Sequence, residues 1–255
     1  MTAVNEAATS SPREHHDEHV QQVSTAGGRD ASSPRAHGPL PVLLVGLTIV
    51  TGLVDAFSYL SLGHVFVANM TGNVVFLGFG LAGVGGISLV ASLVAVLAFA
   101  LGAAAGGRWS VRRAPHRGHL LAVAAAAQAV LVVAAAVVAA SAGVGGTAVR
   151  LVLVALLAVA MGGQNAVARR MAVPDLTTTV LTLTVTGLVA DATTSKVRLR
   201  RVVPVLAMLG GALAGGALLR WVSPSAPLWA AAGVLVACLV TAHWKSRRPQ
   251  AEAWR

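Results

Sequence analysis

Long uncharged apolar stretches dominate the pattern of the chain. Residues 56–107 contain no Asp, Glu, Lys or Arg, and residues 118–149 contain none either. About 20 apolar residues are enough for a helix to cross the hydrocarbon core of a bilayer. The pattern therefore predicts membrane helices rather than the core of a soluble domain. The apolar segments are 41–62, 69–84, 87–107, 120–142, 148–168, 175–190, 202–220 and 226–244.

Two of these segments, 69–84 and 175–190, are much shorter than the other six. A helix of about 15 residues is about 22 Å long at 1.5 Å per residue. This length is less than the hydrocarbon core of about 30 Å. We therefore expect an all-α polytopic bundle of six long transmembrane helices, with two short helices that re-enter the membrane.

The basic clusters indicate how the segments are threaded. If every segment crossed the membrane, either the cluster at 108–117 or the cluster at 196–201 would face the outside. If the two short segments enter and leave on one side, both clusters face the cytoplasm, as the positive-inside rule requires. This threading leaves Arg220 as the only exception, at a helix end where its side chain can reach the interface. It predicts an inner-membrane protein with cytoplasmic N- and C-termini.

Two parts of the chain echo each other. GLVDA at 52–56 aligns with GGQNA at 162–166, and VANMTGN at 67–73 aligns with VPDLTTT at 173–179. A third collinear match pairs GAAAGG with GALAGG. These matches indicate a duplication, and three crossings in each copy would invert the second copy, as in many secondary transporters. The expected organisation is a disordered tail at 1–38, membrane repeats at 39–146 and 147–246, and a basic tail at 247–255.

The two echoing blocks also resemble a known family. TGLVDAFSYLSLGHVFVANMTGNVVFLG and MGGQNAVARRMAVPDLTTTVLTLTVTGL, with a basic segment before a final hydrophobic pair, are similar to the YoaK family of bacterial integral membrane proteins. The resemblance extends over residues 40–246 and implies a multi-pass protein of the inner membrane. It implies no substrate or mechanism, because the family is grouped as a domain of unknown function.

Composition supports the membrane assignment. Hydrophobic residues make up 56% of the chain and charged residues only 11%, whereas about a quarter of the residues of a soluble domain are charged. The net charge of +10 comes from basic clusters at segment ends, where membrane orientation and anionic headgroups explain it. We therefore expect the lipid bilayer as a partner and no nucleic acid. The single Cys238 cannot form an internal disulfide, and we expect it to pack as a small hydrophobic residue.

Polar residues inside the matching segments define a candidate site. A re-entrant turn must be buried in protein or line a wet cavity, because its backbone groups need partners. Asn69 and Asp175 are suited to helix N-caps, and the two half-helix starts would present partial positive charge near mid-membrane. Asp55 would be either the titratable group of a solute site or a carboxylate that braces the turn against Asn69 or Tyr59. The candidate substrate-binding residues are Asp55, Asn69, Thr71, Asn73, Gln164, Asn165, Asp175, Thr177 and Thr178.

Two pairs of glycines lie in the third matching pair of segments. Gly102 and Gly106, like Gly211 and Gly215, have the GxxxG spacing. Such pairs allow helices to approach closely, either within one chain or between subunits. We expect them to pack within the monomer and leave homo-oligomerisation open.

The chain contains no catalytic constellation. HExxH, GxSxG and Walker motifs are absent, and Asp55 has no acid at its repeat partner, so we expect no enzyme, no cofactor and no metal. The HHDEH run at 15–19 is interpreted as part of a solvated tail, since nothing nearby would fix ligand geometry. The sequence predicts a small-solute transporter or channel with a central polar site between two half-helix N-termini. The alternative is a non-transporting membrane scaffold or accessory subunit.

Overall fold

The computed structural model describes residues 40–112, 117–171, 181–190 and 194–246. The secondary structure in these ranges is helical, without a strand, which confirms the predicted all-α class for this part of the chain. Both predicted tails and the segment that holds Asp175, Thr177 and Thr178 lie outside the described residues. The long helices are α2 (Leu40–Ser61), α4 (Leu89–Arg112), α5 (Arg117–Ala142), α6 (Thr147–Met171), α8 (Ser195–Trp221) and α9 (Ala226–Ser246), and the short ones are α3 (Met70–Leu81) and α7 (Leu181–Ala190).

Several helices extend beyond the apolar segments that predicted them. α4 continues to Arg112 instead of ending at 107, and α8 begins at Ser195 instead of 202. The apolar pattern marks only the part of a helix that suits lipid, whereas backbone hydrogen bonds continue a helix through polar residues as well. The basic clusters at the ends of these segments are therefore partly helical.

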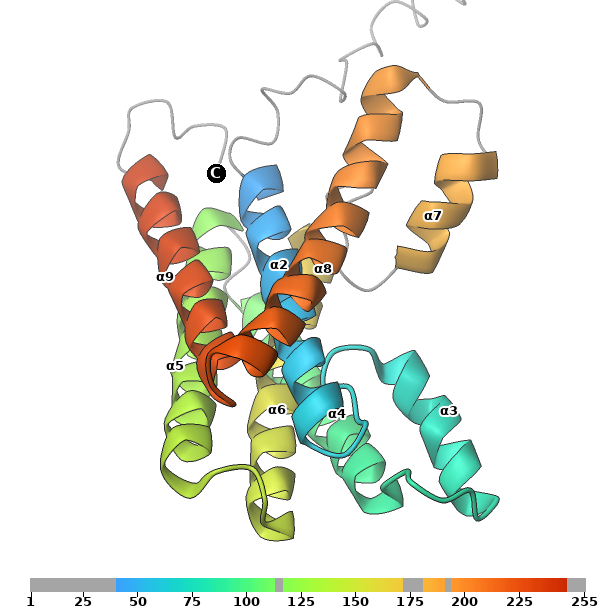
Figure 1. The fold of residues 1–255 in the computed structure, drawn as a ribbon. Helices are drawn as coiled ribbons and strands as arrows, with labels where there is room; N and C mark the ends of the chain where they lie inside the picture. Colours follow the sequence, from blue (N-terminus) through green and yellow to red (C-terminus); the bar gives the residue numbers. More distant parts are fainter. Residues whose placement is uncertain (1–39, 113–116, 172–180, 191–193, 247–255) are drawn as a thin grey trace, which may run out of the picture. The chain divides into compact units, whose positions relative to one another are not determined.

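The lengths of the helices fit a membrane bundle. Among the described residues, 5 helices are long and apolar enough to cross a membrane, namely α2, α4, α5, α6 and α8, whereas the apolar part of α9, Ala226–Ala242, is shorter. α3 has 12 residues and α7 has 10, which makes them about 18 and 15 Å long. α3 lies beside the lower half of α4 and α7 beside the upper half of α8 (Figure 1).

Neighbouring helices in the bundle often come from distant parts of the chain. α4 packs on α6 and α2 packs on α8, while α5 contacts both α6 and α9, and α9 also contacts α2. In Figure 1, α2, α5 and α8 run downwards, and α4, α6 and α9 run upwards. α7 is attached to α8 by Arg201, whose guanidinium donates a hydrogen bond of 2.5 Å to the carbonyl oxygen of Gly187.

The glycine pairs lie at the closest of these helix contacts. A Cβ atom at Gly102 would be 2.1 Å from the carbonyl oxygen of Val159 on α6, and one at Gly211 would be 2.3 Å from that of Ile49 on α2. A Cβ atom at Gly106 or at Gly215 would come within 2.9 Å of the facing helix. Only glycine allows the backbones to approach this closely, so both pairs pack within the chain.

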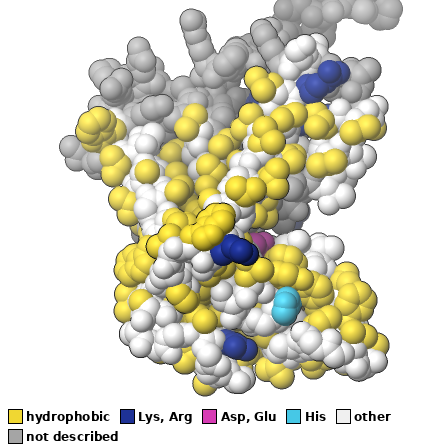
Figure 2. Space-filling model, in the orientation of Figure 1, with side chains coloured by type: hydrophobic (Ala, Val, Ile, Leu, Met, Phe, Trp, Pro, Cys, Tyr) yellow, Lys and Arg dark blue, Asp and Glu magenta, His cyan; other side chains and the backbone are white. Residues whose placement is uncertain are grey.

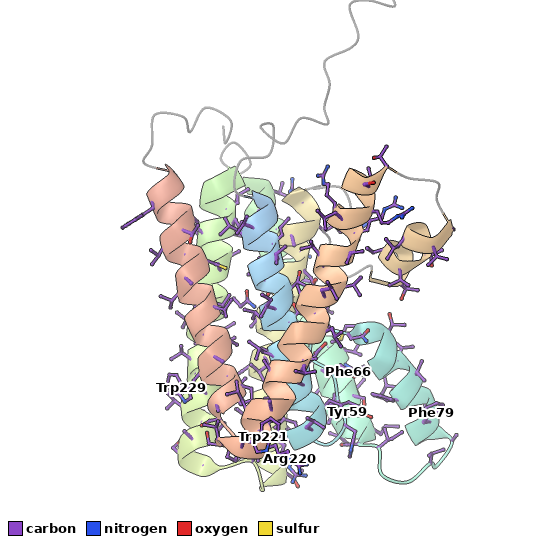
Figure 3. The ribbon with its side chains drawn as sticks, turned by 45° about the horizontal axis from the view of Figure 1, so that its top comes forward. Tyr59, Phe66, Phe79, Arg220, Trp221 and Trp229 are labelled. Atoms are coloured by element: carbon purple, nitrogen blue, oxygen red, sulfur yellow. The ribbon has the colours of Figure 1, made fainter. Side chains whose placement is uncertain are left out.

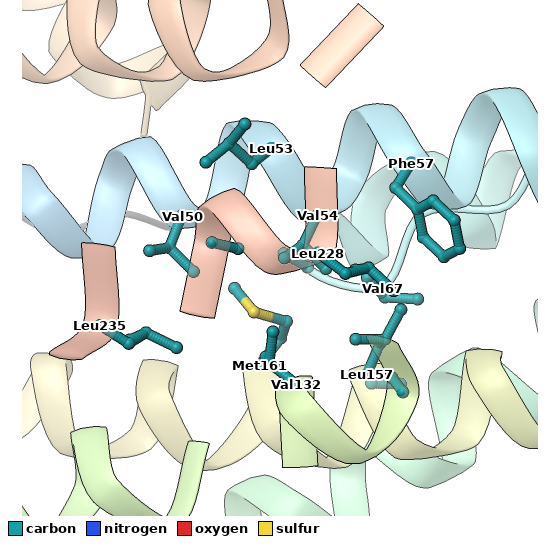
Figure 4. Close-up of a cluster of buried hydrophobic side chains, with 14 of the residues drawn as sticks. Val50, Leu53, Val54, Phe57, Val67, Val132, Leu157, Met161, Leu228 and Leu235 are labelled. Carbon is teal, nitrogen blue, oxygen red and sulfur yellow. The ribbon is translucent and has the colours of Figure 1, made fainter. Parts of the chain in front are cut away.

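Large apolar side chains fill the space between the long helices. Val54 and Phe57 of α2 and Leu157 of α6 are fully buried, as are Leu228 and Leu235 of α9. They come together near Val132 and Met161 at the centre of the bundle (Figure 4). The core therefore depends on α2, α5, α6 and α9, while α3 and α7 lie outside it.

The outer surface is also apolar. Leu101, Val130 and Leu213 are more than two-thirds exposed, and hydrophobic side chains cover much of the face in Figure 2. Trp221 and Trp244, near the ends of α8 and α9, are exposed as well. Exposed aliphatic side chains on long helices are what a lipid environment requires.

Two arginines occupy the lower end of the bundle. Arg220 lies there near the end of α8 (Figure 3). Arg150, in the first turn of α6, donates a hydrogen bond of 2.7 Å to the carbonyl oxygen of Val144 in the loop before it. Arg150 is therefore a second basic residue at this end, besides Arg220, and it lies within the predicted apolar segment 148–168.

Candidate functional site

The turn between α2 and α3 is held by a buried carboxylate. Asp55 lies on α2, two turns before the helix ends, and is only 4% exposed. Its Oδ1 atom accepts hydrogen bonds from the backbone amides of Val67 at 3.0 Å and Ala68 at 2.9 Å. Asp55 therefore braces the turn through backbone groups, and the predicted partner side chains, Asn69 and Tyr59, are not its hydrogen-bond partners among the described contacts.

Asn73 holds the same turn from the other side. Its Oδ1 accepts a hydrogen bond from the backbone N–H of Phe66 at 3.0 Å, and its Nδ2 donates to the carbonyl oxygen of Phe66 at 2.6 Å. The side chain is completely buried. This predicted substrate residue is thus engaged with the backbone, and it satisfies peptide groups that would otherwise lack partners.

Aromatic rings complete the turn. Tyr59 stacks on Phe66 with ring centroids 4.9 Å apart, and Phe66 stacks on Phe76 of α3 at 5.8 Å. Figure 3 shows Tyr59 and Phe66 next to each other, beside the helix of Phe79. The chain reverses at Gly63 and His64, which both have positive φ angles of 96° and 58°. Glycine adopts this conformation without strain, and the His64 ring packs edge-on against Tyr59.

A polar cavity of about 390 Å³ lies next to this turn. The second carboxylate oxygen of Asp55, Oδ2, accepts no hydrogen bond from the described residues. Asp55 is the only acidic residue in the described ranges. The magenta atoms at the base of a hollow in Figure 2 therefore belong to it. We call this space the Asp55 cavity; it is lined by Thr51, Asp55, Ala68, Asn69, Met70, Thr71, Gly72, Val75, Phe99, Asn165, Thr182 and Met208.

The Asp55 cavity brings together four of the predicted residues, Asp55, Asn69, Thr71 and Asn165. Asn69 occupies the N-cap position of α3, but its side chain makes no capping hydrogen bond, so the predicted capping role is wrong in this respect. Thr182, in the first turn of α7, was missed by sequence reasoning. Its only signal is a place among alternating threonines in an otherwise apolar segment.

Gln164 belongs to a different polar cluster in the core. Its Oε1 accepts a hydrogen bond of 2.5 Å from Nε2 of Gln128 on α5, and its own Nε2 donates to Oγ1 of Thr51 at 3.3 Å. The amide chain therefore links α5, α6 and α2. Sequence reasoning missed Gln128. The one feature of the sequence that could have indicated its role is that it is an amide side chain within a long uncharged apolar stretch.

A second cavity lies beside this amide chain. It has a volume of about 310 Å³ and is lined mainly by apolar residues of α4, α5 and α6, among them Trp109 and Leu131. Gln128 belongs to the lining, and its buried Oε1 accepts no hydrogen bond from the described residues. With so few polar groups, this cavity suits an apolar occupant.

The chemistry of the Asp55 cavity is that of hydrogen bonding and charge pairing. Its described lining combines one carboxylate with two amide and three hydroxyl side chains, and contains no Lys, Arg or His. Among the described residues, no group of three His, Cys, Asp or Glu side chains could hold a metal ion. The lining therefore favours ligands that donate hydrogen bonds or carry positive charge.

Comparison with known proteins agrees with this membrane architecture. The chain is 32% identical over 149 residues to the UPF0700 transmembrane protein YoaK of Bacillus subtilis (strain 168), an alignment that covers 58% of this chain and 65% of the relative. The aligned part is thus slightly less than two-thirds of the relative's length. No solved structure matches the chain. The family model described as "Protein of unknown function (DUF1275)" matches residues 43–241, and the protein therefore belongs to this family, as a multi-pass membrane protein.

Proposed function

We propose that the protein is a small-solute transporter or channel of the inner membrane, with its substrate site in the Asp55 cavity. The observation that carries the proposal is that residues from both halves of the chain line this cavity, around a buried carboxylate with one oxygen that accepts no hydrogen bond from the described residues. A polar cavity inside an apolar bundle is costly to maintain. A polar solute that crosses the bundle would need such a cavity.

Equivalent glycine contacts support an inverted repeat. A Cβ atom at Gly52 would lie 2.4 Å from the carbonyl oxygen of Met208, and one at Gly162 would lie 2.1 Å from that of Phe99. In the alignment of the two halves, Gly52 corresponds to Gly162, and Phe99 corresponds to Met208. The same backbone contact therefore occurs twice with the halves exchanged, as expected of two copies related by a two-fold axis.

The helix pairs support the same relation. The α4–α6 contact has its counterpart in α8–α2, α5–α6 in α9–α2, and α3–α4 in α7–α8, while α5–α9 is its own counterpart. Corresponding long helices run in opposite directions in Figure 1. This pattern favours an axis in the membrane plane, six crossing helices, and α3 and α7 re-entering from opposite sides. The positive-inside rule then favours cytoplasmic termini.

The Asp55 cavity would then lie on the pseudo-two-fold axis. Asp55 and Asn165 are equivalent positions of the two halves, as are Phe99 and Met208, and all four line the cavity. Transporters built from inverted repeats bind substrate at the repeat interface, next to the ends of broken helices. The first turns of α3 and α7 contribute Thr71 and Thr182 here.

Flux into proteoliposomes tests the proposal. Wild-type protein is assayed against a panel of small cations, anions and neutral solutes, together with Asp55→Asn, Asn69→Ala and the control Ser141→Ala. Ser141 is exposed and bonds only within its own helix, so its replacement should leave flux unchanged. We expect both cavity variants to lose most of the flux. Normal transport by both would show that the site is elsewhere.

A non-transporting scaffold or accessory subunit is the second candidate. It is favoured by the contacts of Asn73 and of Asp55 Oδ1, which serve the backbone of the turn. Residues that only brace a turn lower stability when replaced, whereas replacement of binding residues often leaves stability unchanged or raises it. If Asn69→Ala and Thr71→Ala both destabilise the protein and no solute of the panel is transported, the scaffold is favoured.

A further inference from the structure

We infer that the Asp55 cavity binds a small organic cation, whose ammonium group pairs with the carboxylate of Asp55 and whose apolar part lies against Phe99 and Met208. The inference rests on the proposed function, because it names the class of solute for the same site. Four properties of the described lining carry it: the charge of Asp55, the contacts of its two oxygens, the volume of the cavity and its apolar walls.

The two oxygens of Asp55 have different environments. Oδ1 already accepts two backbone hydrogen bonds, from Val67 and Ala68, whereas Oδ2 accepts none from the described residues. A carboxylate buried in a membrane protein needs a partner for its charge. The described lining offers no basic side chain, and a cationic solute would supply the positive partner.

The N-terminus of α3 does not reverse this preference. A helix N-terminus carries about half of a positive elementary charge, whereas the carboxylate carries one full negative charge. Two amides of the preceding turn are also already taken by Oδ1 of Asp55. The local balance is negative, and it favours a cation over an anion.

Volume and wall chemistry indicate an organic cation rather than a bare metal ion. The cavity volume of about 390 Å³ falls in the range of about 300–1,000 Å³ that is usual for organic ligands. Met70, Val75, Phe99 and Met208 supply apolar walls. An aromatic ring such as that of Phe99 attracts an ammonium group as well as alkyl groups.

Direct binding to the purified protein in lipid nanodiscs tests the inference. The probes are butylammonium, butanol, butanoate and sodium ion at equal ionic strength, measured by calorimetric titration. We expect butylammonium to bind at least tenfold more tightly than each of the other three. Asp55→Asn should weaken butylammonium binding at least tenfold and Phe99→Leu about threefold, while Ser141→Ala should leave it unchanged.

Each other outcome overturns the inference. If butanoate binds more tightly than butylammonium, the site prefers anions. If sodium binds as tightly as butylammonium, the alkyl chain of the ligand contributes nothing to binding. If Asp55→Asn binds butylammonium as tightly as wild type, the carboxylate is not the ligand's partner. If Asp55→Asn does not fold, Phe99→Leu and Met208→Ala provide the test. Unchanged butylammonium binding by both variants would show that the probe binds outside the Asp55 cavity. Asn at position 55 retains an oxygen for the two amides of the turn, so we expect it to fold.

Flux separates this inference from the proposed function. Binding of butylammonium that depends on Asp55, without flux of any solute, would support the cation site and reject transport. Flux of an anion or neutral solute that butylammonium does not inhibit would support transport and reject the cation site. Flux of alkylammonium ions that Asp55→Asn abolishes would support both.

Discussion

Asn73 and Phe66 form a closed hydrogen-bonded ring in which the side-chain amide of Asn73 pairs with both backbone groups of Phe66. The N–H of Phe66 donates to Oδ1 at 3.0 Å, and Nδ2 donates to the Phe66 carbonyl oxygen at 2.6 Å. An amide side chain can make this pair because it carries a donor and an acceptor side by side, like a peptide group. A side chain of α3 thereby provides the hydrogen-bond partners for backbone groups in the turn before this helix.

Replacement of Asn73 by Ala should therefore destabilise the protein. Two backbone groups of Phe66 would lose their partners, and each unsatisfied buried group costs about 1–3 kcal/mol. The melting temperature of the purified protein, measured by intrinsic fluorescence, should fall clearly below that of wild type. Asn69→Ala is the matched control, because the Asn69 side chain makes no capping hydrogen bond. Equal melting temperatures for the two variants would contradict the bracing role.

Asp55→Ala and Asp55→Asn should differ in stability. Asn retains an oxygen that can accept from Val67 and Ala68, whereas Ala leaves both amides without that acceptor. Hydrogen bonds to a charged group contribute about 1.5–3 kcal/mol each. Thermal unfolding should show a larger loss for Ala than for Asn. If the two variants have the same melting temperature, the hydrogen bonds that Oδ1 accepts do not stabilise the turn.

The glycine contacts predict a pattern of tolerance along α4 and α8. Gly102→Ala and Gly211→Ala should both destabilise the protein, by about 1–3 kcal/mol, because the new methyl groups would meet backbone of the facing helices. Gly107→Ala and Gly210→Ala meet nothing within 4 Å, and a helical Gly→Ala change is favourable by up to about 1 kcal/mol. Chemical denaturation of the four variants checks this order. Destabilisation by the two controls would count against it.

The amide chain of the core should behave non-additively. Gln128→Leu removes the donor to Gln164, and Gln164→Leu removes the acceptor for Gln128, so each single variant leaves a buried amide without its partner, at a cost of about 1–3 kcal/mol. The double variant removes both groups and should cost less than the two single changes together. A double-mutant cycle of unfolding free energies measures this coupling. A coupling energy of zero would show that the hydrogen bond between Gln128 and Gln164 does not contribute to stability.

The proposed threading predicts which loops can be labelled from outside the cell. In a Cys238→Ser background, single cysteines at Val84 and Gly145 should react with a membrane-impermeant maleimide in intact cells. A cysteine at Thr194 should react only after permeabilisation, and the background without an added cysteine should remain unlabelled. Val84 separates the alternatives, since it would lie inside if α3 crossed the membrane completely.

The sequence alone was enough to predict the helices and their order. An apolar run long enough for a bilayer has no other stable form there, because backbone groups in lipid must bond within the segment. The prediction of a short helix over 69–84 therefore lies close to the observed Met70–Leu81. The ends were less accurate, as at the start of α8, because hydropathy does not register the polar turns of a helix outside the lipid.

The partners of the polar side chains were decided by the tertiary structure. Sequence reasoning singled out Asp55, Asn73 and Gln164 as one site, but only Asp55 lines the cavity, while Asn73 bonds to Phe66 and Gln164 bonds to Gln128. An amide pairs with whichever donor or acceptor the fold brings within about 3 Å, and its residue type does not specify that neighbour. Packing of α2, α4, α6 and α8 determined which polar groups face open space and which meet each other.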